Sequence, residues 1–363
     1  IAGWLTDQGT KTGEPVAITL PKGPHQIAAV LGTLTAGATY VPINPHHPQH
    51  RKQQIHTTAG ITTTLDTTTI TQALHHPNPL PAPANIPDTT PAYIIFTSGS
   101  TGQPKGVQLT HRATQNTIED INHRYQITPN DNTIQISQLD FDLSVYDILG
   151  TLTAGATITT TPENQHPDPH TWAHLIHHHK TTIWNTVPTL LDILLTTAQP
   201  HQLTTLRLAL TSGDWIPLDQ HHRLTTKNPH TQHIALGGAT EAAIWSNHHH
   251  ITHIPPHWTS IPYGTPLRNQ TYRITDPHGN DRPNWVPGEL WIGGQGLATG
   301  YTNDPQRTTT QFPTHHNQRW YRTGDQGRYW PDGTIEFLGR TDHQIKLNGH
   351  RIELGDIETH LHT

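Results

Sequence analysis

Cysteine and methionine are both absent from this chain of 363 residues. The lack of cysteine excludes disulfides, iron–sulfur clusters, thiolate zinc sites and a cysteine nucleophile, and it favours a reducing compartment. Charged residues make up only 13%, and 21 basic against 27 acidic residues leave a net charge of −6, so no nucleic-acid footprint is expected. A run of about 18 apolar residues and a signal-peptide pattern are also missing, which argues against a membrane span or secretion.

The hydrophobic share of 32% is low, but the net charge is small and the apolar runs are long enough for strands. Disorder usually combines low hydrophobicity with high net charge, so this composition predicts a folded globular protein. The length suggests two domains or one large multilayered domain. Because the chain opens with Ile1 and contains no methionine, we expect it to be a piece of something longer.

Histidine is abundant, with 32 residues spread along almost the whole chain. Triplets such as residues 177–179 and 248–250 invite a metal-binding interpretation. Adjacent side chains, however, point to opposite faces of a strand and diverge by about 100° on a helix, so such runs rarely chelate as a unit. The even enrichment of histidine and threonine favours a composition bias over a metal array.

Short β-branched runs alternate with helical patterns, which predicts α/β layering with parallel strands. Residues 15–20 and 38–42 are predicted strands on either side of a helical pattern. The closely spaced prolines of residues 76–91 exclude a helix or a central strand and predict an extended connector into a buried strand at 92–97. After His257, shorter strands broken by Gly, Pro and Asp predict a β-rich subdomain.

Directly after the strand at 92–97, residues 98–106 read SGSTGQPKG. Small hydroxyl residues and glycines after a buried strand suit a loop that wraps phosphate oxygens, with Lys105 as the counter-charge. The string departs from the pattern GxxxxGK[ST], because Pro104 stands in place of the second glycine and Gly106 in place of Ser or Thr. A flexible surface loop is the alternative interpretation of the string alone.

With YIIFT before it and GVQLTHR after it, this string resembles the phosphate loop of the adenylate-forming superfamily, and more specifically of a nonribosomal peptide synthetase adenylation domain. Five further stretches match the family's motifs in order and spacing: FDLS at 141–144, GGATE at 237–241, GELWIGGQGLATGY at 288–301, YRTGD at 321–325 and GRTDHQIKLNGHRIELGDIE at 339–358. One such motif can arise by chance, whereas six in the family's order and spacing do not. The resemblance covers nearly the whole chain.

The resemblance implies an α/β fold with the large N-terminal core of adenylate-forming enzymes, built of stacked α/β layers plus a β-rich subdomain. This core would span residues 1–341. Residues 342–363 would hold the hinge, at Asp342, and the first residues of a small C-terminal domain that is mostly missing. The catalytic Lys of that small domain would lie beyond Thr363, either because the chain is cut or because a methyltransferase is inserted after Glu358.

The resemblance also assigns a site for ATP and Mg²⁺. The phosphates would be held by Thr97, Ser98, Gly99, Ser100, Thr101, Gly102 and Lys105. Adenine would lie along Gly237, Gly238 and Ala239, although Gly237 replaces the family's usual Tyr and Ala239 its usual Pro. Thr240 would donate to the α-phosphate and Glu241 would hold Mg²⁺, which makes them catalytic together with Lys105. Asp325 would accept the ribose hydroxyls, and Arg340 would face the nucleotide.

Substrate-binding residues carried over from the family are Asp142, Leu143, Tyr146, Asn185, Leu210, Ser212, Leu236, Ile244 and Trp245. The carboxylate of Asp142 would pair with a substrate α-ammonium, so the substrate should be an amino acid. The set resembles the family's cysteine-selecting signature, with serine and threonine as alternatives, since one hydroxyl or methyl changes binding by only about 1–3 kcal/mol. For Leu210 and Leu236 taken alone, an ordinary place in the core is the alternative.

The implied reaction is ATP-dependent formation of an aminoacyl-adenylate, followed by transfer to the phosphopantetheine thiol of a carrier domain, in the cytoplasm. The implied partners are a peptidyl carrier domain, an MbtH-like accessory protein, a condensation or heterocyclisation domain and an inserted methyltransferase, with neither nucleic acid nor membrane. Two alternatives stay open: an acyl- or aryl-CoA ligase of the same superfamily, and a non-catalytic scaffold that docks carrier and accessory proteins.

Overall fold

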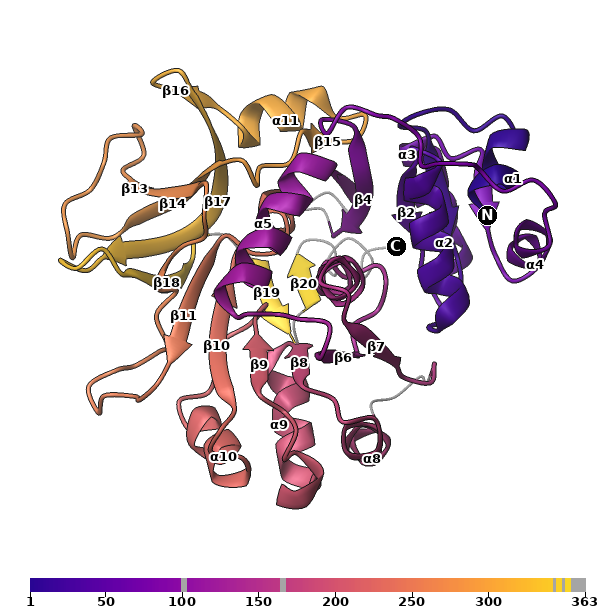
Figure 1. Cartoon of the computed structure of the whole chain (residues 1–363). Helices are drawn as coiled ribbons and strands as arrows, with labels where there is room; N and C mark the ends of the chain where they lie inside the picture. The colour runs from indigo at the N-terminus through magenta and orange to yellow at the C-terminus, as the bar shows by residue number, and fades with distance from the viewer. Residues whose placement is uncertain (99–102, 164–167, 342–343, 348–349, 354–363) are drawn as a thin grey trace.

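The computed structural model describes residues 1–98, 103–163, 168–341, 344–347 and 350–353. The predictions for Gly99, Ser100, Thr101, Gly102 and the hinge residue Asp342 fall outside these ranges. The described residues form three larger sheets and one two-stranded hairpin (Figure 1).

The first sheet is built mainly from the N-terminal part of the chain. Its strands, from edge to edge, are β15 (Gly300–Tyr301), β5 (Lys105–Thr110), β4 (Pro91–Thr97), β2 (Thr39–Pro42), β1 (Pro15–Ile18) and β3 (Thr63–Leu65). The pairings from β4 to β3 are parallel, whereas β4 and β5 are antiparallel. The predicted strands at 15–20, 38–42 and 92–97 are confirmed. The helices of this region are α1 (Ala2–Asp7), α2 (Pro24–Thr35), α3 (Gln49–Ala59) and α4 (Thr69–Leu74).

The second sheet carries the parallel strands expected from the alternating pattern. Its order is β12 (Thr265–Pro266), β11 (Asn247–Ile251), β10 (Gln232–Gly237), β9 (Leu208–Thr211), β8 (Ile183–Thr186), β6 (Asn132–Gln135) and β7 (Thr157–Thr160). The pairings from β10 to β7 are parallel. Parallel strands end at the same edge of a sheet, so the residues after β8, β9 and β10 lie close together.

Helices separate the two sheets and cover the far face of the second one (Figure 1). Between the sheets lie α5 (His111–Arg124) and a helical run made of α6 (Leu143–Val145), the π-helical turn η1 (Tyr146–Gly150) and α7 (Thr151–Thr153). The far face and its margin carry α8 (Pro169–His179), α9 (Pro188–Thr197), the 3₁₀ turn η2 (Pro200–Gln202) and α10 (Gln220–Lys227). The hydroxyl of Thr110 caps α5 by accepting a hydrogen bond from the N–H of Ala113.

A third, antiparallel sheet confirms the β-rich region predicted after His257. It consists of β13 (Gln270–Thr275), β14 (Gly288–Gly294), β17 (Gln318–Tyr329), β16 (Thr314–His315) and β18 (Ile335–Arg340). The motif at 321–325 lies inside the long strand β17. The remaining elements are η3 (Thr240–Ala242), α11 (Pro305–Gln311) and the hairpin of β19 (Gln344–Leu347) and β20 (His350–Glu353).

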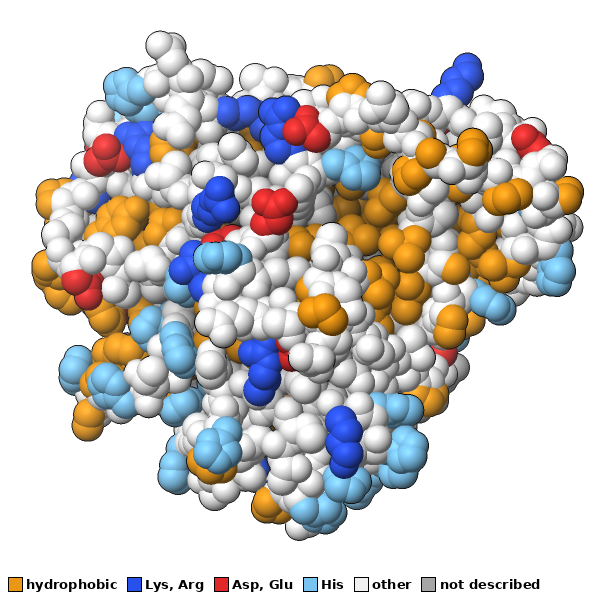
Figure 2. Space-filling view, viewed as in Figure 1, with side chains coloured by type: hydrophobic (Ala, Val, Ile, Leu, Met, Phe, Trp, Pro, Cys, Tyr) orange, Lys and Arg blue, Asp and Glu red, His pale blue; other side chains and the backbone are white. Residues whose placement is uncertain are grey.

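One hydrophobic core joins the first sheet, the central helices and the near face of the second sheet. A separate apolar cluster lies between the second sheet and α8 and α9. The side chains of α5 are buried over a wide face because this helix packs between layers. In Figure 2, histidines are scattered over the surface, many of them at the lower edge. Within the described ranges, no helix is long and apolar enough to cross a membrane.

Candidate active site

The predicted phosphate loop joins two neighbouring antiparallel strands. Thr97 ends β4 and Lys105 begins β5, and the two residues are paired across the ladder. Ser98 follows Thr97 and is partly buried. The Oγ1 atom of Thr97 is buried and has no hydrogen-bond partner in the described part of the chain. A buried polar atom without a partner is unfavourable, so this hydroxyl is suited to a polar ligand at the strand end.

Lys105 and Glu241 form an ion pair in the interior. The Lys105 Nζ lies 3.0 Å from the Glu241 Oε1, and the two side chains are 9% and 0% exposed. The hydroxyl of Tyr301 donates to the same Oε1 at 2.9 Å, and the Lys105 ammonium lies 5.1 Å from the centre of the Tyr301 ring. The structure thus brings together a cation suited to phosphate and an acidic side chain suited to a metal ion.

The surroundings of Glu241 fit the magnesium role predicted for it. Mg²⁺ binds oxygen ligands and is usually held by one or two carboxylates together with substrate phosphates. Glu241 supplies a buried carboxylate, and it hydrogen-bonds or ion-pairs with residues next to the predicted phosphate loop. A magnesium ion here would neutralise phosphate charge, while Lys105 would act on the phosphates themselves.

The predicted α-phosphate donor and the predicted ammonium acceptor are in direct contact. The Thr240 Oγ1 donates to the Asp142 Oδ2 at 2.7 Å, across a sequence separation of 98 residues. Asp142 is only 6% exposed. In the assumed reaction the carboxylate of the amino acid attacks the α-phosphate, so the groups that hold the ammonium and the α-phosphate must be close. The contact meets that requirement.

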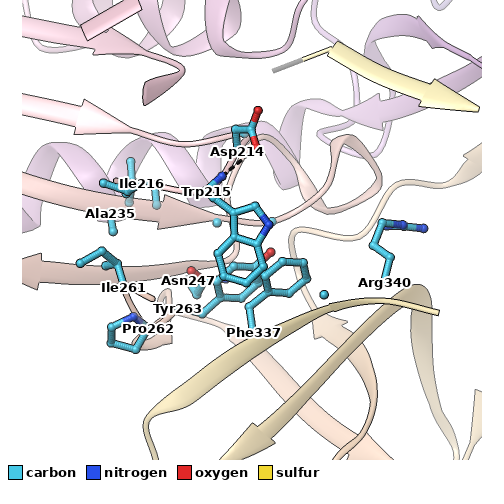
Figure 3. Close-up of a pocket in the computed structure, with 15 residues that line it drawn as sticks. Asp214, Trp215, Ile216, Ala235, Asn247, Ile261, Pro262, Tyr263, Phe337 and Arg340 are labelled. Atoms are coloured by element: carbon cyan, nitrogen blue, oxygen red, sulfur yellow. Dashed lines mark hydrogen bonds between the residues drawn. The ribbon is translucent and has the colours of Figure 1, made fainter. Parts of the chain in front are cut away.

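Two cavities meet beside this contact. The larger, of about 420 Å³, lies between the ends of β9 and β10 and the strand β18 (Figure 3). The smaller, of about 70 Å³, has Asp142 and Thr240 in its wall. Gly213, Gly238 and Arg340 line both cavities, so one extended ligand can occupy the two together.

The predicted pocket residues divide into three groups. Those that line the smaller cavity are Asp142, Leu143, Ser212, Ile244 and Trp245. Leu236 lines the larger cavity instead. Tyr146, Asn185 and Leu210 are buried behind these walls and line neither cavity. Of the predicted nucleotide residues, Gly237 lines the larger cavity, Gly238 and Arg340 line both, and Ala239, Thr240 and Asp325 line the smaller one.

The indole of Trp245 forms part of the wall of the smaller cavity and is backed by the ring of Tyr146. The indole N–H of Trp245 donates to the Ser212 Oγ at 3.0 Å, and the rings of Trp245 and Tyr146 lie 5.0 Å apart. The Tyr146 hydroxyl is directed elsewhere, to the Oδ1 of Asn122 at 2.9 Å. The substrate side chain would therefore meet mostly apolar surface, with the Ser212 oxygen already hydrogen-bonded.

A strained turn places Trp245 in this wall. Ala243 and Ile244 have φ values of 56° and 73°, and the N–H of Trp245 donates to the carbonyl of Ala243 at 2.9 Å. A three-residue turn with positive φ is rare, and a β-branched residue in it costs about 1–3 kcal/mol. Such strain is typical of ligand sites, but the sequence has no glycine here that would have signalled the turn.

A buried carboxyl group that the sequence did not single out lies behind the pocket. Asp147 is 0% exposed, and burial raises its pKa to about 8. The Nδ2 of Asn185 donates to its Oδ1 at 2.8 Å and also to the carbonyl of Leu143 at 3.3 Å. Asp147 therefore holds the Asn185 amide in one orientation, with its Nδ2 turned to protein acceptors.

Replacing Asp147 by Asn should stabilise the protein at pH 8 and have little effect near pH 4. The unfolded carboxyl ionises near pH 3.8, whereas the folded one keeps its proton up to about pH 8. Stability should thus fall as the pH rises through this window, and the neutral amide removes that loss. We expect a gain of about 1–3 kcal/mol at pH 8, measured by denaturant unfolding at both pH values. The matched control is Asp219→Asn, at a side chain that is 67% exposed. An equal gain in stability at both pH values for Asp147→Asn would contradict the raised pKa of Asp147.

Asp325 and Arg340 are paired across β17 and β18 at the junction of the two cavities. The Arg340 guanidinium donates to the Asp325 Oδ1 at 2.5 Å and to the carbonyl of Thr323 at 3.2 Å. A carboxylate held at this junction is well placed to accept hydroxyl groups of a ligand that spans both cavities. The sequence predicted both residues for the nucleotide but not their contact.

Residues 1–302 match the family of AMP-binding enzymes, and the chain belongs to this family. Its architecture is that of the large N-terminal part of adenylate-forming enzymes, as the sequence predicted. The family is thus one of adenylate-forming ligases.

Its relatives include proteins of nonribosomal peptide synthesis. The chain is 48% identical to the anguibactin system regulator of Vibrio anguillarum, over 99% of its own length and 36% of that protein. It is 45% identical to pyochelin synthetase PchE of Pseudomonas aeruginosa, over 99% of its length and 26% of that protein. The chain therefore spans about a third or less of these relatives. The crystal structure of the nonribosomal peptide synthetase FmoA3 in its α-methyl-L-serine-AMP-bound form matches with a TM-score of 0.87 at 39% identity, over 94% of this chain and 40% of that one. The predicted resemblance to nonribosomal peptide synthetase adenylation domains is confirmed.

Proposed function

We propose that this chain binds ATP, Mg²⁺ and an amino acid and forms an aminoacyl-adenylate. The observation that carries the proposal is the contact between Thr240 and Asp142 in the wall of a small cavity that adjoins a larger one. The amino acid would occupy the small cavity with its ammonium on Asp142. The adenosine would occupy the larger cavity, with its ribose near Asp325 at the junction.

In this arrangement a carboxylate oxygen of the amino acid attacks the α-phosphorus, and the bond to the bridging oxygen breaks so that pyrophosphate leaves. Negative charge builds up on phosphate oxygens, so catalysis rests on positioning and electrostatic stabilisation. Thr240 would donate to the α-phosphate, while Thr97, Ser98 and Lys105 would hold the β- and γ-phosphates. Mg²⁺, held by Glu241, would supply further positive charge at the phosphates.

The acyl group would then move to the phosphopantetheine thiol of a carrier domain. The thiol sulfur attacks the acyl carbon, a thioester forms and AMP leaves. The partner would be a peptidyl carrier domain of a longer synthetase, alongside condensation or heterocyclisation domains. This proposal includes residues 1–341 as the large core and Asp342 as the hinge about which a small domain would rotate.

Amino-acid-dependent ATP–pyrophosphate exchange tests the proposed function against its alternatives. It should be measured on this chain and, where the natural protein is longer, on that longer protein. Exchange that requires an amino acid supports the proposal. Exchange with acyl or aryl acids that lack the ammonium would favour a CoA ligase, and binding of carrier proteins without any exchange would favour a scaffold.

Among the amino acids, exchange should be greatest with L-cysteine and next greatest with serine. The small cavity measures about 70 Å³, and the ring of Trp245, which packs against Tyr146 behind it, lines its wall, which disfavours large side chains. The Ser212 oxygen accepts from Trp245 and the Asn185 Nδ2 is taken by protein acceptors, so neither group is fully available to a substrate hydroxyl. The Ser212 O–H and the Asn185 Oδ1, which has no partner among the described residues, could still bond a hydroxyl, which keeps serine second.

A thiol is a weaker hydrogen-bonding group than a hydroxyl and loses less on entering such a site. The expected preference for cysteine over serine is on the order of 10–200-fold in kcat/KM. The measurement is exchange across the proteinogenic amino acids under reducing conditions. A maximum at an aromatic, charged or β-branched amino acid would show that the pocket residues are misassigned, while leaving the reaction class intact.

A further inference from the structure

The larger cavity has an aromatic wall that the predicted nucleotide residues do not include. Trp215 follows β9 and lines this cavity with a side chain that is 49% exposed. The loop that carries it begins with Gly213, at a φ of 86°, and the N–H of Trp215 is bonded to the Asp214 Oδ1 at 2.8 Å. A large exposed aromatic surface inside a cavity is typical of a binding site.

The indole of Trp215 packs against Phe337 of the third sheet. The Trp215 and Phe337 rings lie 4.8 Å apart, and Tyr263 is stacked on Phe337 at 4.9 Å with an interplanar angle of 2°. Figure 3 shows the indole above Phe337 and Tyr263, all in the wall of the cavity. Because these contacts are already formed, the position of the indole is largely set before any ligand binds.

Position 237, which also lines the cavity, carries no ring, because it is a glycine where the family usually has Tyr. A Cβ atom added at Gly237 would lie 2.8 Å from the Oδ1 and 2.9 Å from the Nδ2 of Asn247. Asn247 cannot easily give way, because it is 0% exposed and its Nδ2 donates to the Tyr272 hydroxyl at 2.7 Å. A side chain at position 237 would therefore require the buried amide of Asn247 to move.

We propose that Trp215 stacks on the adenine ring of ATP and is the main aromatic contact of the base in this chain. The proposal rests on the proposed function, since it assumes that adenosine occupies the larger cavity. Stacking of a base on an aromatic side chain changes affinity by about 5–150-fold on alanine substitution, which corresponds to 1–3 kcal/mol. Stacking is tolerant of base identity, so Trp215 should contribute to affinity rather than to the choice of adenine.

The test is the dissociation constant for ATP, adenosine and inorganic tripolyphosphate, measured by calorimetry. Trp215→Ala should weaken ATP and adenosine by about 5–150-fold and leave tripolyphosphate unchanged, whereas Trp215→Phe should keep most of the affinity. Trp285 provides a matched control, because it is 50% exposed and does not line the cavity. Trp285→Ala should bind all three ligands as the unmodified chain does.

Fluorescence gives an independent measurement, since stacking on a base quenches an indole. Quenching by ATP should be seen in the unmodified chain and in Trp285→Phe, and it should be lost in Trp215→Phe. If Trp215→Ala bound ATP and adenosine each as tightly as the unmodified chain does, the stacking proposal alone would be overturned. If the unmodified chain bound neither ATP nor adenosine, the proposed function would fail, and the stacking proposal with it.

Discussion

Replacing Asp142 by alanine should lower the affinity for the amino acid by a factor on the order of 10²–10³, while the affinity for ATP changes only a few-fold. Asp142 is 6% exposed and is the predicted acceptor for the substrate ammonium in the wall of the smaller cavity. Without it the ammonium would be transferred from water into an apolar cavity without a counter-charge, which is costly. Calorimetric titration with cysteine, serine and ATP measures both affinities.

A ligand without the ammonium distinguishes two causes of weak binding by Asp142→Ala: loss of the ion pair with the ammonium, and general damage to the pocket. 3-Mercaptopropionate has the carboxylate and thiol of cysteine but no ammonium. The unmodified chain should bind it far more weakly than cysteine, whereas Asp142→Ala should bind the two with similar affinity. If Asp142→Ala retained the full preference for cysteine, another group would have to hold the ammonium and the pocket assignment would be wrong.

The sequence predicted those parts of the site that depend on local pattern. A buried strand followed by small hydroxyl residues and a lysine predicted a loop over residues 98–106 after the strand that ends at Thr97. The structure shortens that loop, because Lys105 already begins β5 and pairs with Thr97. Ser212 and Gly237 came from the family resemblance, and the structure places them at the cavities, at the carboxyl ends of the parallel strands β9 and β10. The loop after the buried strand needs only a hydrophobic run and a strand end, which a single sequence reveals, whereas Ser212 and Gly237 could be named only through the family motifs.

The missed features depend on contacts between distant segments. The amide of Asn185 is oriented by Asp147, and no local pattern links a residue of β8 to one of η1. Trp215 could be read as an ordinary loop residue until its ring was seen against Phe337 of the third sheet. The positive φ of Ile244 was unpredictable for another reason, because tertiary packing imposes it on a residue type that disfavours it.

The buried ion pair of Lys105 and Glu241 is expected to contribute both to folding stability and to catalysis. Both side chains are almost fully buried, so removing one charge leaves the other uncompensated. Such a change typically costs about 3–5 kcal/mol of folding free energy. A loss of activity in Lys105→Met or Glu241→Gln alone would therefore be explained equally well by unfolding, and a single variant cannot test the catalytic assignment.

The double variant Lys105→Met with Glu241→Gln makes the distinction. Removing both charges should restore most of the stability lost in either single variant, because no unpaired charge remains. ATP–pyrophosphate exchange should nevertheless stay reduced by a factor on the order of 10²–10³ or more, since a phosphate contact and the proposed Mg²⁺ ligand are both missing. Thermal unfolding and exchange at several Mg²⁺ concentrations measure the two effects separately. The amino-acid preference should remain that of the unmodified chain, because neither residue lines the smaller cavity. A double variant that regained full exchange together with its stability would reduce the pair to a structural role.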